Sequence, residues 1–282
     1  MGRHFSTQTL RASALTSLQS ETHESVYVAA HAVDLVTGDV LFALNEQVVM
    51  PGVSLGRLLL LAEVAARLQR DPLSGLDRMD RFGEKSTHSS GLWRSMDASL
   101  LSVHDLAALV GATNDSLAVH VLLRRVGFAA VHARAEAAGM NNATLLDLAR
   151  DHEATDDAHS LGTSSVTDLT TFFSSLALGR IDNVATSRQV IEWLSLNSDL
   201  SLVSSAFGLD PHIHPHTQRG ITLVNATSAV RGVLSEAGLV QGKHATVAFA
   251  VSAYGDDDDL PTRLAVIDAM RTLGVNLLEY VY

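Results

Sequence analysis

The chain has 282 residues, of which 46% are hydrophobic, and its formal net charge is −11. This length and hydrophobic content predict a well-buried globular protein with one large domain or two intertwined ones. The negative net charge argues against nucleic acid or an anionic membrane as the main partner. The absence of cysteine excludes disulfides, thiol catalysis and cysteine-ligated metals.

The first twenty residues lack the continuous apolar stretch of a signal peptide, so we expect a cytoplasmic protein. Within them LRASALTSL, at 10–18, is weakly amphipathic and predicts a surface helix. No run reaches about 18 uncharged apolar residues, and we therefore expect no membrane span.

The residues from 25 to 50 predict two strands joined by a turn. The stretch SVYVAAHAVDL at 25–35 is rich in strand-forming residues, and VTGD at 36–39 has turn chemistry. The run VLFALNEQVVM at 40–50 predicts the second strand.

From residue 54 to about 205 the hydrophobic pattern is mainly helical. Ser102 is followed by Asp105 as in a capping box, and glycines stand where several apolar segments end. The segments that predict helices are 58–70, 102–112, 114–127, 129–139, 165–179 and 185–196, and the glycines are Gly127, Gly139 and Gly179.

Beyond about residue 216 the strand pattern returns, with turns expected near 236–243. The strand segments are 220–228, 229–238 and 244–255. The acidic run GDDDD at 255–259 predicts a solvated turn rather than a metal site. A long amphipathic helix at 260–281 closes the chain.

Strands at both ends with helices between them predict an α/β (α+β) fold. One antiparallel sheet is built from both termini and flanked by helices, and an all-helical domain is inserted into it. We expect residues 1–53 and 206–282 to form the sheet domain and residues 54–205 to form the helical domain, with a cleft between them.

This layout resembles the class A β-lactamases and their penicillin-binding relatives, over nearly the whole chain. The resemblance rests on spaced features that agree in order: VDLVTGDVLFALNEQVVMPGVS, LSVHDLAALVGATNDSLAVHVLLRRVG and AAGMNNATLLDLARD. It implies a β-lactamase-like serine-hydrolase fold. Such enzymes use a Ser-x-x-Lys nucleophile motif, a Ser-Asp-Asn motif and a Lys-Thr-Gly strand that binds the substrate carboxylate.

By this resemblance, Ser54 holds the nucleophile position at the start of a helix. Arg57, one turn later, stands where the family has lysine. A guanidinium has a pKa above about 12 and does not act as a base near neutrality. The alternative is that Ser54 is only a helix N-cap and that Arg57 pairs with a carboxylate.

The second motif reads Asn114-Asp115-Ser116 in place of Ser-Asp-Asn. Ser116 is displaced by two positions from the place of the relay hydroxyl, and Asn114 does not relay a proton in the same way. We expect Asp115 to be a buried, hydrogen-bonded residue at a helix start.

The third motif reads Ala226-Thr227-Ser228 in place of Lys-Thr-Gly, at the end of an apolar strand. A rival match at 218–220, Gln-Arg-Gly, keeps the glycine but lacks a preceding strand. Either match lacks the lysine. The hydroxyls of Thr227 and Ser228 fit a binding strand and an ordinary strand equally well.

Two further residues are weaker candidates. Glu153 lies in the stretch that resembles the approach to the omega loop, but the sequence lacks the spaced Glu and Asn that would hold a hydrolytic water. Trp93 either lines the mouth of the cleft or is a core or surface anchor.

Three histidines alternate in DPHIHPHTQ, namely His212, His214 and His216, and imidazoles at that spacing can bind zinc. Prolines 211 and 215 interrupt the segment, and exposed loop histidines are common, so we expect no metal site here. We also expect no cofactor.

Since the required chemistry is missing at four positions of one cleft, we expect a pseudoenzyme that binds a small molecule or a protein partner there. The first alternative is an active serine hydrolase that uses Ser54 on an ester or amide, with Arg57 binding an anionic group. The second is a purely structural subunit with a filled cleft. We expect neither nucleic acid nor a membrane as a partner.

Overall fold

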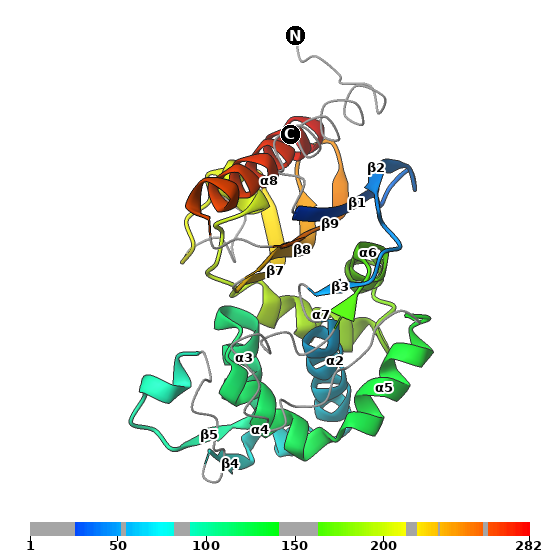
Figure 1. The fold of residues 1–282 in the computed structure, drawn as a ribbon. Coiled ribbons are helices and arrows are strands. Elements are labelled where there is room, and N and C mark those ends of the chain that lie inside the picture. The colour runs from blue at the N-terminus through cyan, green and yellow to red at the C-terminus, as the bar shows by residue number, and fades with distance from the viewer. Residues whose placement is uncertain are drawn as a thin grey trace.

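A five-stranded antiparallel sheet forms the centre of the protein (Figure 1). The computed structural model describes residues 26–51, 55–81, 91–140, 163–212, 219–230, 232–255 and 259–282. The strand order is β2-β1-β9-β8-β7. The strands are β1 (Val26–Asp34), β2 (Val40–Leu44), β7 (Thr222–Val230), β8 (Val233–Gln241) and β9 (Thr246–Gly255).

The sheet joins the two ends of the described chain, because β1 pairs with β9 along its whole length, from Val26 opposite Gly255 to Asp34 opposite Val247. The predicted mixed fold, with one antiparallel sheet built from both terminal parts, is therefore confirmed.

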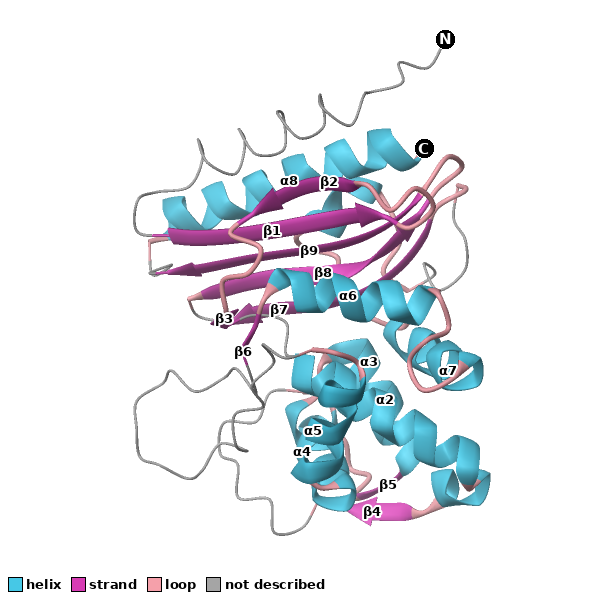
Figure 2. Ribbon diagram, turned by 90° about the vertical axis from the view of Figure 1, so that its right-hand side faces the viewer, coloured by secondary structure: helices cyan, strands magenta, loops and turns pink. Residues whose placement is uncertain are grey.

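Helices lie on both faces of this sheet. The last helix, α8, covers one face and α6 covers the other, with the remaining helices gathered beyond α6 (Figures 1 and 2). The helices are α2 (Leu55–Arg70), α3 (Val103–Thr113), α4 (Ser116–Val126), α5 (Phe128–Ala137), α6 (Val166–Ala177), α7 (Val184–Leu194) and α8 (Leu260–Val281).

Short elements connect the helices. Two small antiparallel pairs join β3 (Met50–Pro51) to β6 (Thr163–Ser164) and β4 (Arg78–Asp80) to β5 (Leu100–Ser102). The short 3₁₀ helices are η1 (Pro72–Leu76), η2 (Trp93–Ser95) and η3 (Val203–Phe207).

Two apolar cores form on the two faces of the sheet. Beneath α8, side chains of β9 such as Phe249 and Val247 pack with Leu273 and Leu277. On the opposite face, residues of the sheet pack with the apolar sides of the other helices; fully buried members include Leu59, Leu106, Leu122, Phe172 and Phe173. The continuous apolar run of α2 is thus explained by burial on nearly all sides.

Local signals in the sequence set several helix boundaries. The Ser102 hydroxyl accepts a hydrogen bond from the Asp105 N–H (3.1 Å), and a capping box starts α3 as predicted. Gly127 ends α4 with a φ of +83°, a backbone conformation that favours glycine.

The predicted turn near 236–243 is wrong for most of its length. Residues 233–241 form the continuous strand β8, and the chain turns before and after it instead. The polar side chains of Ser235 and Glu236 are tolerated inside this strand because both are buried and hydrogen-bonded within the fold. Likewise, the predicted strand at 40–50 ends at Leu44, where Asn45 adopts a φ of +48°.

No single helix in the described ranges is long and apolar enough to cross a membrane; only α4 and α5 taken together, at a bend of 88°, reach that length and composition. The helix predicted at 10–18 lies outside the described residues.

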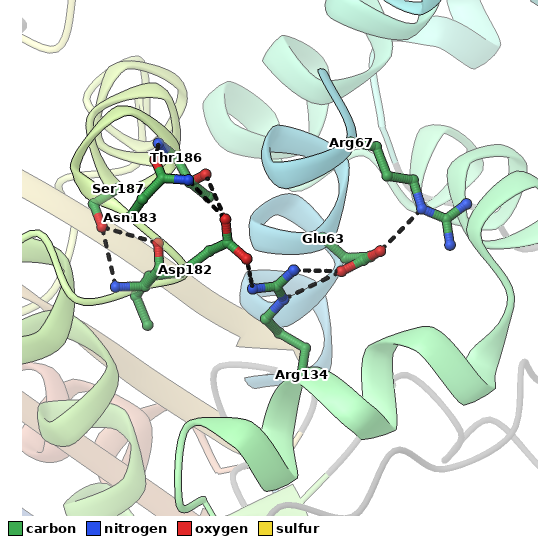
Figure 3. A network of polar contacts seen from close by, with 8 residues as sticks. Glu63, Arg67, Arg134, Asp182, Asn183, Thr186 and Ser187 are labelled. Atoms are coloured by element: carbon green, nitrogen blue, oxygen red, sulfur yellow. Dashed lines mark hydrogen bonds and ion pairs between the residues drawn. The ribbon is translucent and has the colours of Figure 1, made fainter. Parts of the chain in front are cut away.

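An ion-pair network fixes the middle of α2 against its neighbours (Figure 3). Glu63 of α2 lies between Arg134 of α5 (Nη2–Oε2 2.6 Å) and Arg67 of α2 (Nε–Oε1 2.9 Å). Arg134 also pairs with Asp182, before α7, at 2.9 Å. Burial lowers the pKa of Arg134, but the hydrogen bonds and charges of the two carboxylates outweigh that effect and raise it. The network therefore ties α2 to α5 and to the start of α7.

Candidate functional site

The structure brings three separately predicted positions to one small cavity. Arg57 in the first turn of α2, Asn114 at the end of α3, and Ala226 with Thr227 on β7 all line it. Asn197, which follows α7, also lines this cavity, and apolar side chains of α2, α3 and α7 complete the wall. Its volume is about 20 Å³. The cavity lies against β7, an edge strand of the sheet.

Arg57 is the charged residue of this cavity. Its Nε is buried and has no hydrogen-bond partner within the part of the chain that the structure describes. Burial lowers its pKa to about 10, and the negative charge of Asp115 opposes that effect. The guanidinium is therefore protonated near neutrality, so the side chain does not supply a base there.

Asp115 is fully buried and serves as a structural anchor. Its Oδ1 accepts a hydrogen bond from the Ala118 N–H (3.0 Å), which caps α4, and its Oδ2 accepts one from the Trp93 N–H (2.8 Å). A Cβ added to Gly91 would lie 2.4 Å from the Asp115 carboxylate. Asp115 therefore joins the start of α4 to the segment around Trp93, as a hydrogen-bonded residue at a helix start.

Trp93 is a core residue. Its side chain is fully buried, and its Nε1 donates to the Ala98 carbonyl oxygen (2.7 Å). Full burial is what the core-anchor alternative expects of this side chain.

The other predicted positions fall elsewhere. Ser116 is the first residue of α4 and Ser228 lies on β7, but neither lines the cavity. Of the rival third motif, Arg219 donates to the Gly208 carbonyl oxygen (3.3 Å) and Gly220 precedes β7; they do not line the cavity either. Ser54, Glu153, Gln218, His214 and His216 lie outside the described residues.

A buried polar cluster behind β7 was not predicted. The Asn197 Nδ2 donates to the Thr227 Oγ1 (3.2 Å), which donates in turn to the Asp199 carbonyl oxygen (3.0 Å). Further in, the Asn225 Nδ2 donates to the Glu236 Oε1 (2.7 Å). Polar residues inside the strand patterns of β7 and β8 were the available signal for this cluster.

Glu236 is the titratable centre of that cluster. Burial raises its pKa to about 7, although hydrogen bonds from Ser204 and Asn225 work in the opposite direction. The Ser204 backbone N–H donates to Oε2 (3.1 Å). The carboxyl group therefore connects β8, β7 and η3.

A larger cavity of about 270 Å³ lies at the other end of α2, and three arginines line it. Arg67 pairs with Glu63, and Arg125 pairs with Asp77. Arg67 also donates to the Val126 carbonyl oxygen (3.0 Å), at the end of α4. Since cations stabilise helix C-termini, these arginines are explained by the ends of α2 and α4. We therefore place the candidate site at the smaller cavity, where the motif positions meet.

The fold and the position of this cavity define a β-lactamase-type protein. The family model Beta-lactamase2, described as "Beta-lactamase enzyme family", matches residues 11–281. The chain belongs to this family. No curated protein matches it significantly.

Solved structures agree in fold at low sequence identity. The β-lactamase from Sphaerobacter thermophilus superposes with a TM-score of 0.79 at 18% identity, covering 95% of this chain and 98% of that chain. PBP-A gives 0.77 at 14% identity, covering 95% and 94%. The class A β-lactamase from Mycobacterium abscessus gives 0.75 at 13% identity, covering 94% and 97%.

Proposed function

We propose that this chain is a pseudoenzyme of the β-lactamase family that binds a ligand in its remnant cleft without hydrolysing it. The observation that supports this proposal most strongly is the protonated Arg57 in the cavity, three residues after Ser54 in the sequence. A serine nucleophile needs a neighbouring base to take its proton, and a guanidinium with a pKa of about 10 stays protonated at neutral pH.

The other two motif positions support the same proposal. Asn114 lines the cavity at the position of the relay serine, and an amide does not pass on a proton as a hydroxyl does. Ala226 lines it at the position of the lysine that binds the substrate carboxylate. Loss of a general base alone removes about 10²–10⁴ in rate, and loss of positioning adds to that.

The test compares the native chain with Ser54→Ala in three assays. These are hydrolysis of a chromogenic cephalosporin, mass spectrometry after incubation with penicillin, and labelling by a serine-reactive phosphonate. A variant of PBP-A has been captured as an acyl-enzyme with penicillin G, which makes PBP-A a suitable positive control. We expect neither turnover nor an adduct from the native chain. Hydrolysis that depends on Ser54 would establish the active serine hydrolase instead.

A purely structural subunit is the second candidate, and the small volume of the cavity favours it. About 20 Å³ holds little more than one water molecule. Ligand binding distinguishes the two candidates. A pseudoenzyme with a ligand site binds small molecules in the cavity, whereas a structural subunit with a filled cleft does not.

A further inference from the structure

Arg57 occupies a position that is unfavourable for a cation on three counts. Its Nε is buried, and no hydrogen bond reaches it from the described residues. It also lies in the first turn of a 16-residue helix, where the helix dipole favours negative charge. A cation whose Nε is buried without a hydrogen-bond partner is destabilising, so an anion that pairs with it is the expected complement.

The negative charge of Asp115 acts on Arg57, but the Asp115 carboxylate does not pair with it directly. Each of the Asp115 carboxylate oxygens accepts a backbone hydrogen bond, from Trp93 and from Ala118. Arg57, whose Nε is buried without a hydrogen-bond partner among the described residues, lines a cavity that Asn114 also lines. Arg57 and Asn114 thus bring a cation and a side-chain amide to one cavity.

The remaining polar groups of the cavity are already engaged with each other. The Thr227 hydroxyl accepts from Asn197 and donates to a backbone carbonyl oxygen, that of Asp199. The Asn197 Oδ1 accepts from the Asp199 N–H (3.4 Å). These bonds hold the β7 side of the cavity in place and leave recognition of a charged group to Arg57.

We infer that this cavity binds the carboxylate group of a small organic acid, held by Arg57. This inference rests on the proposed function, because it names the ligand class of the same cleft. A guanidinium edge matches a planar carboxylate with two parallel hydrogen bonds. A carboxylate is planar and has three heavy atoms, so it fits a small cavity of about 20 Å³ better than a tetrahedral oxyanion such as sulfate does.

The test titrates the full chain with sodium formate, acetate and sulfate at constant ionic strength, in a zwitterionic buffer balanced with methanesulfonate. The Nε–H signal of Arg57 in ¹⁵N NMR spectra reports contact, and the unfolding midpoint reports stabilisation by binding. We expect formate and acetate to shift the Arg57 signal in a saturable way and to raise the midpoint. Sulfate should bind at least tenfold more weakly.

Variants separate the site from a general salt effect. Arg57→Gln should weaken acetate binding at least tenfold, and Arg57→Lys, which keeps the charge but loses the planar edge, should weaken it severalfold. Arg70→Gln is the matched control, since Arg70 is exposed at the other end of the same helix. An equal response of the native chain and Arg57→Gln, an equal response to sulfate, or no saturable shift would overturn the inference.

Two sources of the carboxylate are distinguished by a further pair of probes. N-acetylglycine carries a peptide-like group and a free carboxylate, and N-acetylglycinamide is its neutral counterpart. Tighter binding of N-acetylglycine than of acetate supports a peptide-like ligand, equal binding supports a free small acid, and equal binding of the amide overturns the carboxylate assignment. The hydrolysis assays are independent of these titrations, so a failure of the proposed function and a failure of the carboxylate assignment are distinguishable.

Discussion

The Asn225 Nδ2 donates a 2.7 Å hydrogen bond to the Glu236 Oε1 across the paired strands β7 and β8, and neither side chain reaches solvent. The pKa of Glu236 is raised to about 7 from its ordinary 4.5, chiefly by burial. The folded protein therefore binds this proton more tightly than the unfolded chain does. The resulting stabilisation is complete below about pH 4.5 and is lost as pH rises through about 7.

Glu236→Gln removes this titration. We expect the free energy of unfolding of the native chain, relative to the variant, to fall by on the order of 3 kcal/mol between about pH 4.5 and pH 7.5. Urea unfolding across this range measures it. Glu279→Gln, which removes an exposed glutamate of α8, controls for the loss of one negative charge. Parallel curves for native protein and Glu236→Gln would contradict the prediction.

Replacing Arg134 tests the network of Figure 3. Arg134→Met leaves the nearly buried Glu63 with only Arg67 as a partner, and we expect a loss of about 3 kcal/mol in the free energy of unfolding. Adding Glu63→Gln should recover part of that loss, because the orphaned charge is gone. The control is Arg125→Met, whose pair with Asp77 is exposed and worth at most about 1 kcal/mol. Equal losses for the two arginines would show that burial of the pair is immaterial.

Gly91 is expected to be intolerant of a side chain. A Cβ there would lie 2.4 Å from the Asp115 carboxylate, and the φ of +131° is itself unfavourable for alanine. At Gly127, with a φ of +83°, an added Cβ would meet no atom within 4 Å, so only the backbone penalty remains. Chemical unfolding should therefore show Gly91→Ala to be about 1–2 kcal/mol less stable than Gly127→Ala. Equal effects would mean that the segment shifts freely away from Asp115.

Arg57→Met should stabilise the protein when no carboxylate is present. Replacing this cation, whose Nε is buried without a hydrogen-bond partner among the described residues, by an apolar side chain is expected to add about 1–3 kcal/mol to the free energy of unfolding. The measurement is urea unfolding in the methanesulfonate buffer, with Arg70→Met as the control. A loss of stability would mean that Arg57 is compensated within the native fold.

Arg57→Lys should not create β-lactam turnover. The substitution restores a side chain that can act as a base, but Asn114 and Ala226 still line the cavity in place of the relay hydroxyl and the second cation. Cephalosporin hydrolysis by Arg57→Lys, compared with the same variant carrying Ser54→Ala, measures the effect. Turnover that depends on Ser54 would show that the lysine alone is sufficient.

Most of the long helices and strands, and their order, are predictable from local sequence. Hydrophobic periodicity and capping residues such as Ser102 are local signals, so they located α3, the closing helix and the strands β1 and β9. The spaced motif positions also led to the family, because spacing along the chain survives even where Arg57, Asn114 and Ala226 replace the usual residues. Local signals failed within β8, where a turn was predicted near 236–243 and the strand runs on to Gln241.

The environment of the polar and charged residues depends on the tertiary structure. Polar residues of β8 are tolerated in the sheet because partners distant in sequence, such as Asn225 and Ser204, satisfy Glu236. Burial of Trp93 and the unpartnered Nε of Arg57 likewise depend on which of the described helices and strands meet around them. Desolvation and long-range hydrogen bonds are properties of packing, and packing sets the charge state and the chemistry of the cavity.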